Sequence, residues 1–228
     1  MAIGVSLVGT RGTNVGASVT TGSGSSVGGP GNHGLLFLSF DPGVTVSSIV
    51  DNLVGGNTFV QLDSTRTADG RSAVYWCENW GGGAGHTVTA NFSGGSFGVA
   101  HLVNVTGSLS SGAIALATGV TADTAYPISL ASGVLAQAAN AVLMMCQDNR
   151  TAGGAGYASD GSLTVLSAEN DIASFWTSGV GFAITSSIAD TTYRIDRNAA
   201  PVNASAHLII LKEAAAGGSL GLMGQAIL

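Results

Sequence analysis

Hydrophobic and polar residues alternate along most of this chain in short runs, and clusters of Gly, Asn, Asp and Ser separate the runs. Short runs rich in Val, Ile, Thr, Phe and Tyr are typical of β-strands. The pattern predicts strands near residues 3–8, 15–20, 34–41, 44–50, 57–62, 71–79, 86–92, 97–106, 125–131, 141–147, 162–168, 179–186, 191–195 and 205–213. Because no helical segments separate them, we expect an all-β fold, an antiparallel β-sandwich of jelly-roll type.

Two of these segments show how the predicted strands would pack. In residues 86–92, Val88 and Phe92 share one face and polar side chains occupy the other. Residues 205–213 are apolar on both faces, which predicts a strand in the middle of a sheet. We therefore expect sheets that are buried on at least one side.

The two ends of the chain differ from its middle. We expect a single β-sandwich domain over residues 1–213, with a loop-rich segment near its start, followed by an Ala/Gly spacer and an apolar tail over 214–228. An exposed apolar tail is costly in water, so it is expected to pack on its own domain or on a neighbouring subunit. The alternative is a frayed end. The residues that would make this assembly contact are Leu220, Leu222, Met223, Ile227 and Leu228.

Charged residues are unusually rare in this chain. They make up 9% of the sequence, against roughly 25% in an ordinary globular domain, and the net charge is -6. The arginines are scattered, which argues against nucleic acid as a partner because phosphate binding needs clustered positive charge. No apolar run is long enough to span a membrane, and the first residues lack the pattern of a secretory signal. A surface of Ser, Thr, Gly and Ala fits a subunit packed against copies of itself better than a freely diffusing enzyme.

Neither a cofactor nor a metal is expected. The four histidines share no ligand spacing, no Gly-x-Ser-x-Gly motif occurs, and no Gly-rich stretch carries the Lys of a phosphate-binding loop. A calcium ion at Asp148–Asn149 or Asp160–Gly161 stays an open alternative. Cys77 and Cys146 lie in apolar runs and are expected to be buried thiols, with a disulfide possible if their strands are neighbours.

Acidic residues offer few candidates for catalysis. Asp63, Asp69 and Glu78 could gather if the strands near 57–62 and 71–79 form a hairpin. The stretch from Asp63 to Arg71, however, is typical of a turn with solvated ion pairs. We therefore expect no enzymatic activity.

A carboxylate between two tryptophans is the best candidate for sugar binding. Trp76 and Trp80 flank Glu78, and aromatic rings can stack on a sugar while a carboxylate holds its hydroxyls. The favoured interpretation is that both tryptophans belong to the core or rim of the sandwich. A glycan contact through these three residues is the alternative.

The order of strand types resembles a β-sandwich module of bacteriophage virion proteins and bacterial surface proteins. An apolar strand (GLLFLSF) is followed by a Val/Thr strand (VTVSSIVDN), an Asn-Thr pair, an aromatic strand (SAVYWCENW), a Gly loop and the strand HTVTANF. The second half is similar, with ANAVL before one strand and AHLIIL in the closing one. The resemblance covers most of residues 13–213.

The resemblance implies a structural role in a virion. Such a module would be a head-decoration, tail or fibre subunit, assembled in the host cytoplasm, with other copies of itself and other virion proteins as partners. These modules are not known as enzymes. The alternative function is a carbohydrate-binding or host-surface adhesion module, with a surface glycan as its ligand.

Overall fold

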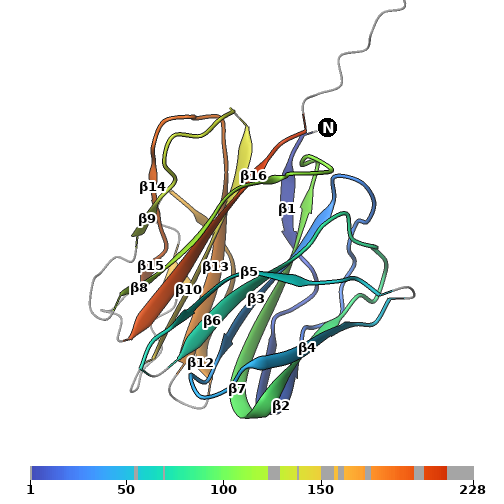
Figure 1. The fold of residues 1–228 in the computed structure, drawn as a ribbon, viewed down its shortest axis with the longest axis vertical. Coiled ribbons are helices and arrows are strands. Elements are labelled where there is room, and N and C mark those ends of the chain that lie inside the picture. The colour runs from blue at the N-terminus through green and yellow to red at the C-terminus, as the bar shows by residue number, and fades with distance from the viewer. Residues whose placement is uncertain are drawn as a thin grey trace, which may run out of the picture.

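A computed structural model describes residues 2–53, 56–68, 70–122, 129–137, 139–149, 157–158, 162–172, 176–197 and 203–214 (Figure 1). Within these ranges every regular element is a β-strand and every paired strand is antiparallel, which confirms the all-β, sandwich-like fold. The strands are β1 (Gly4–Leu7), β2 (Gly12–Thr20), β3 (His33–Phe40), β4 (Val46–Asp51), β5 (Val60–Arg66), β6 (Arg71–Cys77), β7 (Val88–Thr106), β8 (Ile114–Ala122), β9 (Ser129–Ala131), β10 (Asn140–Asn149), β11 (Tyr157–Ala158), β12 (Thr164–Ile172), β13 (Trp176–Thr185), β14 (Thr192–Arg194), β15 (Asp196–Arg197) and β16 (Ala204–Lys212). In this part of the chain no helix is long and apolar enough to cross a membrane.

The first sheet is built from the N-terminal half of the chain. Its strand order is β1-β7-β3-β6-β5, and β2 and β4 also pair with β7. Strand β3 is buried along its whole length, since each of its faces covers a different hydrophobic cluster. The alternation predicted for residues 86–92 is confirmed, because Val88 and Phe92 are buried and the residues between them alternate in exposure.

Strand β7 bends and so belongs to two layers. Its later part pairs with β3, and its first part pairs with β4. Strand β2 pairs with both parts of β7. Gly16 of β2 pairs with Ser96 and Ser18 pairs with Asn91, so the single residue Ala17 of β2 lies opposite residues 92–95 of β7. Such a bulge bends the sheet, so β4 and the first part of β7 fold over the outer side of β3 and β6 (Figure 1). They enclose a second hydrophobic cluster there.

The second sheet faces the first and has the order β12-β13-β10-β16-β8. Strand β16 lies between β10 and β8, which confirms the prediction of an inner strand for residues 205–213. The main apolar core lies between the two sheets and includes Phe37, Val103, Leu143 and Ile209. A third cluster covers the other face of the second sheet.

The clearest differences between the sequence predictions and the structure concern β7, β8 and β2. The two strands expected at 86–92 and 97–106 are one continuous strand, β7. Strand β8 was not predicted, because its residues are mostly Ala, Gly and Thr. The strand expected at 15–20, within the loop-rich segment near the start, is longer than predicted: β2 begins at Gly12 and pairs with the long β7.

Candidate functional site

At one end of the space between the sheets, polar side chains replace the apolar core. All of them are buried: Ser39, Ser72 and His101 from the first sheet, and Gln147, Ser178, Ser205 and His207 from the second. We call these seven residues the polar layer. Hydrogen bonds join its two sides: Ser39 Oγ donates to Ser178 Oγ at 3.1 Å, and the hydroxyls of Ser72 and Ser205 are 2.7 Å apart.

His207 joins the two sheets through a Ser-His-Asp arrangement. Its Nδ1 is 2.9 Å from Asp63 Oδ2, and its Nε2 is 2.8 Å from Ser72 Oγ. A carboxylate can only accept a hydrogen bond, so His207 Nδ1–H donates to Asp63, while Nε2 lies within hydrogen-bonding distance of the Ser72 hydroxyl. This hydrogen bond from His207 holds the pKa of Asp63 below its ordinary value. The connectivity matches that of a serine hydrolase.

The surroundings of Ser72 are those of a structural bond and not of a nucleophile. Ser72 and His207 have no exposed surface. The hydroxyl of Ser72 also lies 2.9 Å from Thr65 Oγ1, so neighbouring side chains surround it. A Cβ added at Gly119 of β8 would lie 2.5 Å from Asp63 Oδ2, so the second sheet packs directly against this group. An acyl substrate has no access to Ser72 in this conformation.

The other end of the polar layer is built around His101. Its Nδ1 is 2.9 Å from Ser167 Oγ and its Nε2 is 3.1 Å from Ser178 Oγ. Gln147 of β10 pairs with Ser178 of β13 on one side and with Ser205 of β16 on the other. Both polar atoms of its amide are buried without a hydrogen-bond partner among the described residues. The polar layer therefore fixes how the two sheets face each other, at the cost of one unsatisfied amide.

A second buried Asp-His pair fastens the end of β4. Asp51 Oδ2 lies 2.8 Å from His86 Nε2, and neither side chain is exposed. On its other side, His86 Nδ1 is 2.6 Å from Ser26 Oγ. Asp51 also accepts hydrogen bonds from the backbone N–H of Leu53 and from the side-chain amide of Asn57. These bonds tie the segment that follows β4 to His86, and through His86 to Ser26.

The fourth histidine, His33, stabilises the aromatic end of β6. Its ring stacks on Trp76 with 4.4 Å between the centroids. The backbone N–H of Asn79 donates to His33 Nδ1 at 2.9 Å, so His33 Nε2 carries the proton and donates to the carbonyl of Leu109. Burial lowers the pKa of His33. All four histidines are thus buried and hydrogen-bonded inside the protein.

The structure buries the two tryptophans of the candidate sugar site. Trp76 is 8% exposed and Trp80 is 1% exposed, while Glu78 between them is exposed. Trp80 Nε1–H donates to the carbonyl of Val27, and the indole ring lies against Gly34 of β3. A glycan contact through Trp76, Glu78 and Trp80 stays a prediction, and the burial of both rings gives it no support.

Of the acidic residues considered for catalysis, Asp63 and Glu78 do not come together. Strands β5 and β6 do form the expected hairpin. Asp63 lies within β5 opposite Val74, so the expectation of a solvated turn was wrong for this residue. Glu78 follows the far end of β6, and Asp69 lies outside the described residues.

The cysteines are free and buried, as the favoured interpretation expected. They belong to different hydrophobic clusters, on opposite outer sides of the two sheets. Burial raises the pKa of Cys77 to about 11. Of the calcium candidates, Asp148 is buried and accepts a hydrogen bond from Thr177 Oγ1 at 2.6 Å, while Asp160 and Gly161 lie outside the described residues. The described ranges contain no group of three or more His, Cys, Asp or Glu side chains suited to a metal.

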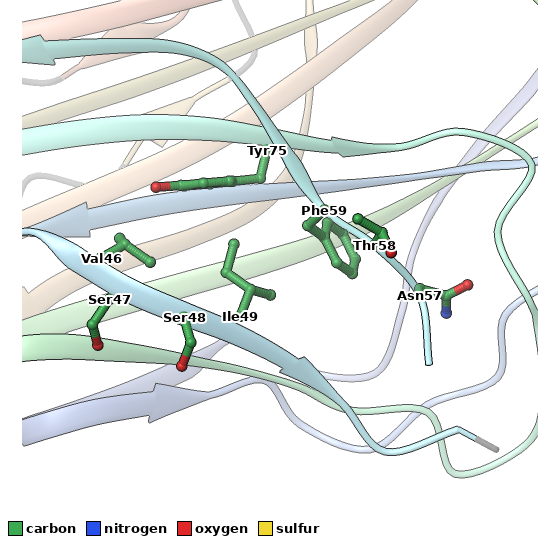
Figure 2. Close-up of a pocket in the computed structure, with 8 residues that line it drawn as sticks. All are labelled: Val46, Ser47, Ser48, Ile49, Asn57, Thr58, Phe59 and Tyr75. Carbon is green, nitrogen blue, oxygen red and sulfur yellow. The ribbon is translucent and has the colours of Figure 1, made fainter. Parts of the chain in front are cut away.

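A groove opens where the curled first sheet does not close. It has a volume of about 300 Å³ and lies between β4 and the segment that leads into β5 (Figure 2). Val46, Ile49 and Phe59 point into it, and Tyr75 of β6 forms its inner wall. The remaining lining residues are Ser47, Ser48, Asn57 and Thr58, so no charged side chain lines the groove. This volume lies at the lower end of the range for ligand sites, roughly 300–1,000 Å³.

Comparison with family models, curated proteins and solved structures found no match to this chain. The residues of the predicted assembly contact, Leu220, Leu222, Met223, Ile227 and Leu228, lie outside the described residues. The groove and the buried histidine clusters were not predicted from the sequence. The only signal for the clusters was that each histidine lies in or next to a predicted strand.

Proposed function

We propose that this chain is a non-enzymatic structural subunit of a bacteriophage virion, either a head-decoration or a tail or fibre subunit. In this role it acts by assembling with copies of itself and with neighbouring virion proteins. The observation that carries the proposal is where the reactive side chains lie. All four histidines, both cysteines and the serine of the Ser-His-Asp group are buried, so none of these reactive side chains lies on the surface.

Apolar residues on that surface support a role in assembly. Val15, Val50 and Val60 are 62%, 54% and 60% exposed, and all three belong to strands of the first sheet. Strand β5 is an edge of that sheet, and β8 and β12 are the edges of the second. Soluble monomers usually protect their strand edges with charge, and this chain has few charges to do so. Pairing with neighbouring subunits would cover edges and apolar residues together.

The proposal is tested by measuring the molar mass of the purified full chain by light scattering at several concentrations. We expect a discrete closed oligomer, and we expect deletion of residues 217–228 to weaken it. A monomer at every concentration would contradict a self-assembling subunit. In that case a glycan array would test the carbohydrate-binding alternative.

A further inference from the structure

The groove of Figure 2 lies between strands that lack a partner on one side. Strand β4 pairs only with β7, and β5 pairs only with β6. No described strand joins β4 to β5 across the groove. The first sheet therefore has an open seam, lined by side chains of β4, of residues 57–59 that lead into β5, and of Tyr75 in β6.

The backbone of β4 presents hydrogen-bonding groups to this seam. The N–H of Asn52 donates to the carbonyl of Thr87, while the carbonyl of Val88 accepts from Thr21 on the β2 side. In an antiparallel ladder, successive residues direct their backbone groups alternately toward and away from one partner. Asp51 pairs with Val88 and Ile49 with Ala90, so Asp51 and Ile49 direct their N–H and C=O groups away from β7. These are the groups to which an added strand would bind.

The side chains of the groove define what kind of strand would fit. Its floor is apolar (Val46, Ile49 and Phe59), and its rim carries neutral hydroxyls. Val50 and Val60, both more than half exposed, directly follow the lining residues Ile49 and Phe59 in the chain. An extended peptide that adds to a sheet edge gains affinity from main-chain hydrogen bonds and specificity from alternate side chains that enter pockets. The fitting partner is an uncharged segment with apolar side chains at alternate positions.

We infer that the groove binds residues 219–228 of a neighbouring copy of this chain as an added β-strand. The segment, SLGLMGQAIL, has no charged side chain. Leu220 and Leu222 are two residues apart, so both would face the groove in an extended strand. Ala214 is the last described residue before this segment, and its N–H donates to the carbonyl of Gly107, just after the end of β7. The groove lies at the opposite end of that strand, beside the first part of β7. The inference rests on the proposed function, because it gives that assembly its contact.

Cysteine cross-linking between full-length chains tests the inference. One copy carries Val46→Cys in the groove and a tagged second copy carries Leu222→Cys. The native Cys77 and Cys146 are buried and should not compete for the new thiols. The matched control is Val15→Cys, which replaces an exposed valine of β2. Docking holds the two thiols together, so after mild oxidation the V46C–L222C pair should form an intermolecular disulfide at least roughly tenfold faster than the V15C–L222C pair.

Three results would overturn the inference. The first is equal cross-linking rates for V46C and V15C. The second is a V46C/L222C double variant that cross-links only within one chain, at a rate independent of concentration. The third is protection of V46C from a thiol reagent by a neutral oligosaccharide and not by the L222C copy. If V46C melts at a lower temperature than V15C, Ser48→Cys on the rim replaces it. A chain that forms oligomers in light scattering but shows no faster V46C cross-linking would overturn this inference and leave the proposed function standing.

Discussion

Replacing Gln147 with methionine should stabilise the protein. The Gln147 side chain is fully buried in the polar layer, and its Nε2 and Oε1 have no hydrogen-bond partner among the described residues. A buried polar group without a partner costs about 1–3 kcal/mol. Methionine has a similar length and no strongly polar atoms, so it should remove this penalty while filling the same space.

We expect the free energy of unfolding of Gln147→Met to rise by about 2 kcal/mol, since part of the gain is offset by imperfect packing of the new side chain. For a chain of this size that corresponds to an increase in Tm of roughly 4–8 °C. Thermal and urea unfolding followed by circular dichroism would measure both quantities. The control is Val15→Met, at a valine of β2 that is 62% exposed, which should change stability by no more than about 0.5 kcal/mol. A lower Tm for Gln147→Met would show that buried water satisfies the amide in solution, and would refute the reasoning.

Two further substitutions test the packing and the inter-sheet hydrogen bonds. In Gly34→Ala the new Cβ would lie 2.3 Å from an indole carbon of Trp80, so urea unfolding should show a loss of about 1–3 kcal/mol, whereas Gly95→Ala meets nothing within 4 Å and should be nearly neutral. Equal stabilities of these two variants would contradict the packing. The lowered pKa of Asp63 means that its carboxylate stabilises the fold above the ordinary pKa of 3.8 and that this stabilisation is lost as the pH falls through the lower folded-state value. Asp63→Asn should therefore lower the free energy of unfolding at neutral pH by about 1–2 kcal/mol. Denaturation at a series of pH values should show this difference shrinking below pH 3.8, and a difference independent of pH would contradict the role given to the carboxylate.

Strands with strong apolar patterns were predictable, and strands defined by their neighbours were not. The predicted segments 34–41 and 205–213 agree with β3 and β16 to within one residue. Strand β8 is made mostly of Ala, Gly and Thr, and its place is fixed by pairing with β16. The Gly-rich stretch in the middle of β7 is typical of a turn, and β7 does bend there, but its flanking parts both pair with β2, so the two predicted strands form one element. Pairing between distant strands is what the sequence pattern could not show.

The buried histidine clusters could not be predicted for the same reason, because their members come from strands that are distant in the sequence. Asp63 is close in sequence to Arg66 and Arg71, which favours a solvated turn, yet its hydrogen-bond partner His207 is 144 residues away. The alternation around Trp76 and Trp80 was compatible with exposed or buried rings. Only the layer formed by β2, β4 and the first part of β7 decides the matter for Trp80, because it covers the cluster to which that ring belongs.

The place of β16 sets the order in which the chain can fold during synthesis. All strands of the first sheet have been made once residue 106 has left the ribosome. Strand β10 ends at residue 149, but its neighbour β16 ends at residue 212. Until then at least one edge of β10 is unpaired, and β8 has no partner within the second sheet. The first sheet can thus form early and act as a template, while the second closes only when almost all of the described chain has emerged. The nascent protein therefore passes through a half-folded state whose unpaired strand edges are prone to aggregation. Slow translation would prolong this state.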